Sequence, residues 1–335
     1  MRILILLLLT VLAGAGALAW DYQRFLDTPA NLAEKEVFVV PSGASLRRVG
    51  QNLAAAGIIE NAHYWELHGR MEGKAQDLRA GEYLLTPDMT PPALLALFIQ
   101  GRTLQYSLTI PEGWNFRQMM QAVADHAHIE NTLNPEDHEA VMEHLGKPGA
   151  HPEGWFFPDT YLFPRGTTDL DFLRRAHERM EHALNVAWEG RQEDLPLETP
   201  YEALILASIV EKETGQAGER SRVAAVFVER LRRGMRLQTD PTVIYGIEQF
   251  DGRIRRRDLR LDTPYNTYTR DGLPPTPIAL PGAAALEAVA HPADSKALFF
   301  VSRGDGTHHF SETYREHRQA VIKYQLDGDA SRYGR

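Results

Sequence analysis

The chain has 335 residues, of which 43% are hydrophobic and 24% are charged, as is typical of a folded protein with more than one domain. Its formal net charge is -9 and no basic stripe is interleaved with aromatic residues, so we expect no nucleic-acid partner. Cysteine is absent, which excludes disulfides, thiolate catalysis and cysteine-ligated zinc.

The N-terminus carries an apolar segment. Residues 3–20 contain no charge and lie between Arg2 and Asp21, and this stretch is long enough to span a membrane. The positive-inside rule keeps Arg2 in the cytoplasm and exports the rest. Ala17-Leu18-Ala19 also fits a cleavage site, so a removable signal peptide is the alternative. We predict an anchor or signal segment over 1–22 and a spacer over 23–35.

Residues 36–102 predict a compact βααβα unit. Strand patterns cover 37–40 and 81–86; helical patterns follow Pro41-Ser42-Gly43 and Asn61, and a third runs from Thr90 to Gly101. The unit resembles a LysM module, a resemblance that implies binding of N-acetylglucosamine-containing glycans. A spacer that shares only the fold is the alternative.

Part of this pattern recurs 70 residues later. Residues 38–43 with Leu46-Arg47 match residues 108–113 with Phe116-Arg117, and Tyr83-Leu84-Leu85 resembles Tyr161-Leu162-Phe163 at a larger offset. Internal duplication with an insertion explains the match. Chance similarity between two strand-Pro-x-Gly turns explains it equally well.

The most strongly marked helix is predicted over 199–215. Thr199, Pro200 and Glu202 form a capping-box signature, and Gly215 supplies a stop. Only Ser208 interrupts the apolar run 203–210, so we expect burial on nearly every side. Glu211 follows at the edge of this dry helix, where its pKa should be raised, as suits a general acid. A solvated helix end is the ordinary alternative.

Several segments around this helix carry polar and aromatic groups. Residues 153–161 combine Glu153 with a dense aromatic cluster suited to sugar stacking, although core packing is the commoner role. Residues 237–246 place amide, hydroxyl, carboxylate and phenol groups close together, and residues 265–268 and 272–278 are too rich in turn residues for regular structure. Polar groups on such loops fit the lining of a ligand cleft. Helices are expected over about 169–188 and 219–233, and a strand over 298–301, with a turn over 304–310 leading into the last helix. The candidates for ligand contact from these loops are Gln238, Thr239, Asp240, Tyr245, Tyr265 and Asn266.

Five motifs occur in order: "EGWFFPDTY" (153–161), "ASIVEKET" (207–214), "RLQTDPTVIYG" (236–246), "YNTY" (265–268) and "GLPP" (272–275). Together they resemble the endolytic murein transglycosylase family, MltG or YceG-like, over nearly the whole chain. The resemblance implies an α+β catalytic domain over 103–325, with the glycan cleft in about 199–325, a lysozyme-like glutamate-bearing helix, and a tail over 326–335.

The family resemblance also implies a function. Such proteins are single-pass bacterial inner-membrane proteins with a periplasmic catalytic domain. They cleave the MurNAc-β-1,4-GlcNAc bond of peptidoglycan glycan strands, leave 1,6-anhydroMurNAc ends and so limit the length of nascent strands. The catalytic glutamate of the family is the first of "VEKE", here Glu211. Peptidoglycan synthases are implied as partners, and no cofactor or metal is expected.

Four rival functions stay open at this stage. A serine hydrolase would use Ser208 and Lys212, although neither the S-x-x-K nor the G-x-S-x-G pattern occurs. Metal-dependent hydrolysis lacks an H-E-x-x-H motif. A membrane-anchored glycan-binding scaffold would make Glu211 structural, and a hydrolytic muramidase would use water. Glu213 is the nearest rival acid, with Arg220 as its expected partner.

Overall fold

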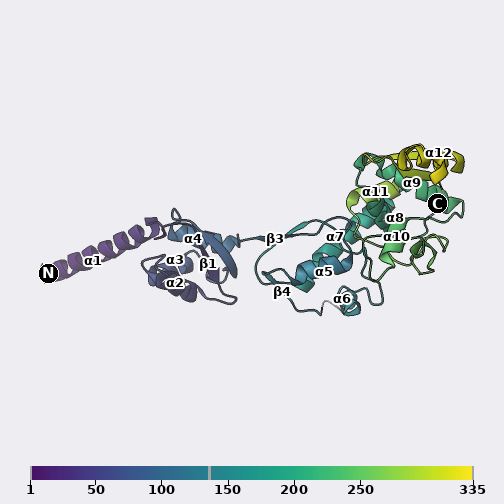
Figure 1. Ribbon diagram of the computed structural model, residues 1–335. Coiled ribbons are helices and arrows are strands. Elements are labelled where there is room, and N and C mark those ends of the chain that lie inside the picture. The colour runs from purple at the N-terminus through teal and green to yellow at the C-terminus, as the bar shows by residue number, and fades with distance from the viewer. Residues whose placement is uncertain (1, 135–136, 334–335) are drawn as a thin grey trace. The chain divides into compact units, whose positions relative to one another are not determined.

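The computed structural model describes residues 2–134 and 137–333 and has the mixed α+β class that the sequence predicts (Figure 1). The chain forms two compact units. The first comprises the residues up to Tyr106 together with Leu162–Gly166. The second comprises Ser107–Tyr161 and the chain from Thr167 onward.

The N-terminal apolar segment lies in a single helix, α1 (Arg2–Asp27). It is long and apolar enough to cross a membrane. Its last turn packs on the first unit: Tyr22 meets Tyr64 edge to face at 5.5 Å, and Phe25 is 3% exposed. Ala30 is buried in the same core. Residues 23–35, predicted as a spacer, thus supply apolar side chains to the core of a folded unit.

The first unit shows the expected βααβα order. Strands β1 and β2 pair antiparallel, with Val37 opposite Leu84 and Val40 opposite Gly81. Trp65 and Tyr83 are fully buried between the sheet and the helices. The relation of this unit to LysM modules stays a prediction. Its elements are β1 (Glu36–Val40), α2 (Leu46–Ala55), α3 (Ala62–Met71), β2 (Gly81–Leu85) and α4 (Pro91–Gln100).

The sequence repeat is also a repeat of local structure. β3 (Tyr106–Thr109) leads through a Pro-Glu-Gly turn into α5 (Phe116–Ala124), as β1 leads into α2. Gly43 and Gly113 have φ values of 70° and 75°. The Ala44 N–H donates to Pro41 O at 3.2 Å, and the Trp114 N–H donates to Pro111 O at 3.4 Å. This agreement favours duplication over chance similarity.

The second unit is mainly helical and carries short two-stranded sheets, in which β4 is parallel to β6 and β7 is antiparallel to β8. β3 pairs with β5, and each of these two strands has residues in both units. Its further elements are β4 (Ile129–Glu130), α6 (His138–His144), β5 (Thr160–Phe163), β6 (Thr167–Thr168), α7 (Asp169–Glu189), α8 (Pro200–Glu213), η1 (Ala217–Glu219), α9 (Arg220–Arg232), α10 (Asp240–Tyr245), η2 (Asp258–Arg260), α11 (Ala283–Ala290), β7 (Phe299–Ser302), β8 (His308–Ser311), α12 (Tyr314–Gln325) and η3 (Ala330–Arg332).

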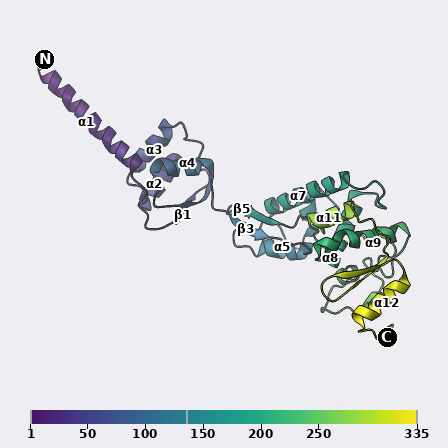
Figure 2. The same cartoon turned by 90° about the horizontal axis from the view of Figure 1, so that it is seen from above.

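Helix α8 is at the centre of this unit, packed against α7, α9 and α11 (Figure 2). Residues 203–210 are all buried, because the apolar run leaves no polar face for solvent. The Thr199 side chain caps the Glu202 N–H, as predicted. The Glu202 carboxylate accepts from the Glu198 N–H rather than from Thr199. The helix ends at Glu213 with an extended Thr214 as its cap, so Gly215 is not its stop.

Two elements differ from the sequence expectations. Residues 240–245 form α10 where an irregular loop was expected; the Thr239-Asp240-Pro241 start favours a helix, but six residues are too few to show helical periodicity. Residues 308–311 form β8 where a turn was expected. That strand depends on pairing with β7, in which Phe299 lies opposite Ser311, and such a partner is invisible in the local sequence.

Ser208 joins α8 to the loop before α11, and its removal should destabilise the second unit. Its hydroxyl donates to Ile205 O at 2.7 Å and accepts the Ile278 N–H at 3.0 Å, with no solvent exposure. Ser208→Ala leaves the buried Ile278 N–H without its partner, at a cost of about 1–3 kcal/mol. Thermal denaturation should show a lower midpoint, whereas Ser42→Ala, at an exposed turn, should not. Equal midpoints for both variants would contradict this role.

Candidate active site

The site is built around the last turn of α8, whose three charged residues face different surroundings. Glu211 faces α9 and the start of α11, through contacts with Arg220 and Gly282. The Lys212 ammonium donates to Gly113 O at 3.1 Å. Glu213 accepts a hydrogen bond from the Thr239 hydroxyl. This spread is what successive residues on a helix produce, and it places Lys212 and Glu213 at two separate cavities.

The Glu211 carboxylate is nearly dry, with its side chain 5% exposed. Its Oε2 accepts the Gly282 N–H at 3.0 Å, and its Oε1 lies 3.5 Å from Arg220 Nη2. Burial raises the pKa of Glu211 above its usual range; the Gly282 N–H, Arg220 and Lys212 oppose the rise, and the charge of Glu112 adds to it. A carboxyl group that keeps its proton nearer neutrality can act as a general acid.

Arg220 connects Glu211 to a second carboxylate. The same Nη2 atom lies 3.8 Å from Glu112 Oε2, and the Nε of Arg220 is buried without a hydrogen-bond partner in the part of the chain that the structure describes. The expected pairing of Arg220 with Glu213 is wrong, because Arg220 pairs with Glu211. Glu112 was not among the predicted site residues, although it occupies the variable position of the repeated Pro-x-Gly turn.

Glu213 belongs to a cavity of about 530 Å³. Burial raises the pKa of the Glu213 carboxyl, and Asp240 adds to the rise. The Tyr268 hydroxyl donates to Asp240 at 2.6 Å. Gln238 is exposed in this cavity with a φ of 49°, a left-handed conformation that is uncommon for a residue with a side chain. Thr239 is 2% exposed, and its hydroxyl donates a hydrogen bond to Glu213 instead of facing the open cavity.

Three other predicted residues, Glu153, Tyr245 and Tyr265, line a larger cavity of about 800 Å³, which Gly113 and Lys212 also border. Glu153 is 3% exposed and accepts from the Tyr245 hydroxyl at 3.0 Å and from the Phe116 N–H at 2.9 Å. Burial raises its pKa to about 7. The rings of Tyr245 and Tyr265 meet edge to face at 4.8 Å. The structure thus brings Glu153, Tyr245 and Tyr265 to one wall, away from Gln238 and Asp240.

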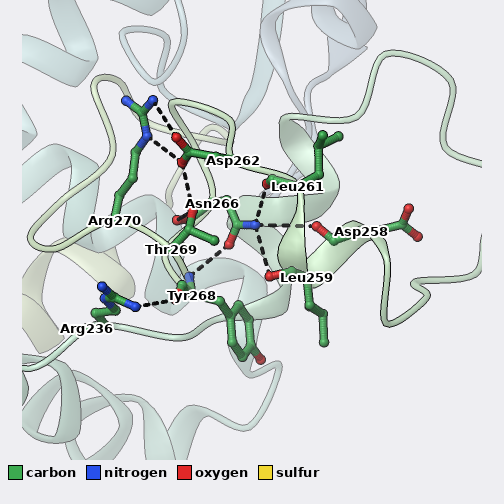
Figure 3. A network of polar contacts seen from close by, with 9 residues as sticks. All are labelled: Arg236, Asp258, Leu259, Leu261, Asp262, Asn266, Tyr268, Thr269 and Arg270. Carbon is green, nitrogen blue, oxygen red and sulfur yellow. Dashed lines mark hydrogen bonds and ion pairs between the residues drawn. The ribbon is translucent and has the colours of Figure 1, made fainter.

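Asn266 holds a loop instead of facing a ligand (Figure 3). Its amide nitrogen donates to the carbonyls of Asp258, Leu259 and Leu261, at 3.3, 3.2 and 2.7 Å, and its side-chain oxygen accepts the Tyr268 N–H. The residue is 1% exposed. A substrate could reach this amide only after the loop had opened, so we assign Asn266 to scaffolding rather than to ligand contact.

A serine nucleophile finds no support in this geometry. Ser208 is fully buried, and both its hydrogen bonds are to backbone groups, so a serine nucleophile would be inaccessible there. Within residues 2–134 and 137–333 no group of three or more acidic or histidine side chains could hold a metal ion. His308 Nδ1 instead lies 2.9 Å from a Glu219 oxygen.

Comparison with known proteins identifies the family. The sequence model described as the YceG-like family matches residues 38–323. The chain belongs to the YceG-like family. An endolytic murein transglycosylase of Bacillus subtilis is 30% identical over 85% of this chain and 83% of its own. One from Streptococcus pneumoniae is 26% identical over 95% of this chain, which spans 64% of that protein. A yceG-like protein structure from Listeria monocytogenes aligns with a TM-score of 0.57 at 28% identity, covering 86% of this chain and 99% of that one.

Glu153 should make this YceG-like protein less stable as pH rises. Its folded pKa of about 7 lies above the ordinary value, so the unfolded chain ionises first and stability falls between about pH 4.5 and 7. Glu153→Gln removes the charge; its amide oxygen can still accept the Phe116 N–H, and its amide N–H can donate to the Tyr245 hydroxyl oxygen. Above pH 7 its free energy of unfolding should therefore exceed that of the parent by up to about 3 kcal/mol. Its thermal midpoint should be higher accordingly. The two midpoints should converge near pH 4.5; a constant difference would contradict the assignment.

Proposed function

We propose that this chain is an endolytic lytic transglycosylase of peptidoglycan in which Glu211 is the single acid and base. The curated relatives that match most of the chain are named endolytic murein transglycosylases. The observation that carries the proposal is the Glu211 carboxyl, buried at the end of a dry helix with a raised pKa and held by an N–H donor and a guanidinium. That environment supports both the protonated and the ionised form.

The proposed reaction needs one carboxyl group. Protonated Glu211 gives its proton to the oxygen that joins MurNAc C1 to GlcNAc, and the C1–O bond breaks. The C6 hydroxyl of the same MurNAc then attacks C1, and the Glu211 carboxylate takes the hydroxyl proton. The products are a 1,6-anhydroMurNAc end and a free GlcNAc hydroxyl, and no water is consumed. Hydrolytic glycosidases, by contrast, usually need two carboxylates.

The two cavities support a division of the glycan-binding residues. We assign Glu153, Tyr245 and Tyr265 to the wall of the larger cavity and Gln238 and Asp240 to the smaller one. Aromatic faces beside polar groups suit sugar rings. Thr239 and Asn266 position these walls through buried hydrogen bonds. Glycan contact by the LysM-like unit belongs to the same proposal, and a spacer role is its alternative.

The proposed location is the bacterial inner membrane, with the catalytic unit in the periplasm. Helix α1 suits a single-pass anchor by its length and composition, and Arg2 at its start favours a cytoplasmic N-terminus. A signal sequence would pass the same test of length. Peptidoglycan is the proposed substrate, and association with peptidoglycan synthases rests on the family role alone.

Replacing Glu211 tests the proposal directly. Glu211→Gln keeps the size of the side chain and should lower the rate of cleavage by about 10²–10⁴-fold, the usual contribution of a general acid or base. The assay is mass spectrometry of the products formed by the full-length protein in detergent from uncrosslinked glycan strands. The parent should release 1,6-anhydroMurNAc ends. Glu312→Gln, an exposed acid of the same unit, is the control and should retain cleavage, and Glu213→Gln tests the rival acid.

The products separate the remaining alternatives. Reducing MurNAc ends would make the protein a hydrolytic muramidase and call for a second carboxylate. Loss of activity in Glu213→Gln but not in Glu211→Gln would move the acid to Glu213. A folded parent that binds strands without cleaving them would be a glycan-binding scaffold.

A further inference from the structure

The second Pro-x-Gly turn lies directly against the candidate acid. The Lys212 ammonium donates to Gly113 O at 3.1 Å. The Gly113 N–H donates to Leu280 O at 2.9 Å, and the Leu280 N–H donates to Trp114 O at 2.6 Å. These bonds join the turn both to the last turn of α8 and to the segment that leads into α11. The side chain at position 112 is thereby held close to Glu211.

Glu112 is positioned by a close approach to backbone. A Cβ built on Gly282 would overlap the Glu112 carboxylate, so this position accommodates the carboxylate only because residue 282 is glycine. Gly282 is also the residue whose N–H donates to Glu211. The Arg220 Nη2 atom lies between the two carboxylates, 3.5 Å from Glu211 and 3.8 Å from Glu112.

The first copy of the turn shows that the turn itself does not need a carboxylate. Ser42 occupies the position equivalent to Glu112, and it is exposed. The glycine after it has a φ within 5° of that of Gly113, at 70° against 75°. In both copies an Asn or Ser caps the following helix, Ser45 before α2 and Asn115 before α5. The acid at 112 therefore has a purpose other than forming the turn.

We infer that Glu112 is a positioning residue for Glu211: it shares the Arg220 cation and thereby keeps Glu211 in the protonated form that the first proton transfer requires. This inference rests on the proposed function. Glu112 does not itself exchange a proton with the glycan, and its effect reaches the substrate through Glu211.

The charges around Glu211 give the direction of the effect. From α9 the Arg220 guanidinium favours the ionised form of Glu211, as do Lys212 from its own helix and the Gly282 N–H at the start of α11. From the turn, the charge of Glu112 favours the protonated form and raises the pKa of Glu211. Without Glu112, Arg220 would face Glu211 as its sole carboxylate partner, so the pKa of Glu211 would fall.

The test is the pH dependence of kcat/KM for uncrosslinked glycan strands, measured with the full-length protein in detergent. The alkaline limb reports the ionisation of the general acid. In Glu112→Gln this limb should move to lower pH by about half a unit or more, the direction expected on removing a like charge. Glu112→Asp keeps the negative charge, so its alkaline limb should lie between that of the parent and that of Glu112→Gln. Glu312→Gln, an exposed acid of the same unit, should leave the limb unchanged.

A second measurement does not depend on turnover. The side-chain carboxyl carbon of Glu211 can be titrated by NMR in protein labelled at glutamate, with its signal assigned by its loss in Glu211→Gln. The midpoint should be lower in Glu112→Gln than in the parent. Glu112→Ser, which copies the first turn, should behave in the same way while keeping the thermal midpoint.

The outcomes separate this inference from the proposed function. In one outcome, the parent cleaves through Glu211 while the alkaline limb and the NMR midpoint of Glu112→Gln stay in place or move to higher pH. That result would overturn the role of Glu112 and leave the proposed function intact. Reduced activity without any shift would show a merely structural residue. If Glu211→Gln cleaves as well as the parent, the proposed function fails, and a lower NMR midpoint in Glu112→Gln would still establish the coupling between the two carboxylates.

Discussion

The cost of holding a carboxyl group out of water is the constraint on which the second unit depends. Helix α8 is apolar along residues 203–210, apart from Ser208, and is covered by α7, α9 and α11. The Glu211 side chain at its C-terminal end is therefore buried as well. An ionised carboxylate there is stable only where donors or cations replace water. The start of α11, Arg220 of α9 and the turn before α5 all meet at Glu211 for this physical reason.

Three buried carboxylates of this unit are compensated in different ways. Glu153 accepts from a hydroxyl and a backbone N–H, and Glu213 accepts from the Thr239 hydroxyl. Of the three, only Glu211 lies within 4 Å of a guanidinium. Glu153 and Glu213 have neutral hydrogen-bond donors, and burial raises the pKa of both carboxyl groups. A group that must alternate between its two forms also needs a charge nearby, because the ionised state is otherwise too costly.

Local patterns predicted the helix and the position of Glu211, but not its neighbours. The cap at Thr199 and the apolar run define α8 within one short segment, and the βααβα order of the first unit follows from similar signals. Arg220 and Gly282 contact Glu211 from 9 and 71 residues away, and Glu112, 99 residues away in the sequence, contacts the same Arg220; no helical or strand period encodes these separations. The repeat was the one signal that could have singled out Glu112, since position 112 is where the two turns differ in charge.

The long Arg220 contact gives the proposed acid, Glu211, a route to a glycan oxygen despite its burial. Proton transfer requires the glycosidic oxygen to come within hydrogen-bond distance of the acid. The Gly282 N–H occupies Oε2 at 3.0 Å, whereas Oε1 faces only a weak contact at 3.5 Å. A substrate oxygen can replace that contact while Arg220 keeps Glu112 as its partner on the other side. In the proposed reaction, the second carboxylate would leave the guanidinium a compensating charge whenever the contact with Glu211 is lost.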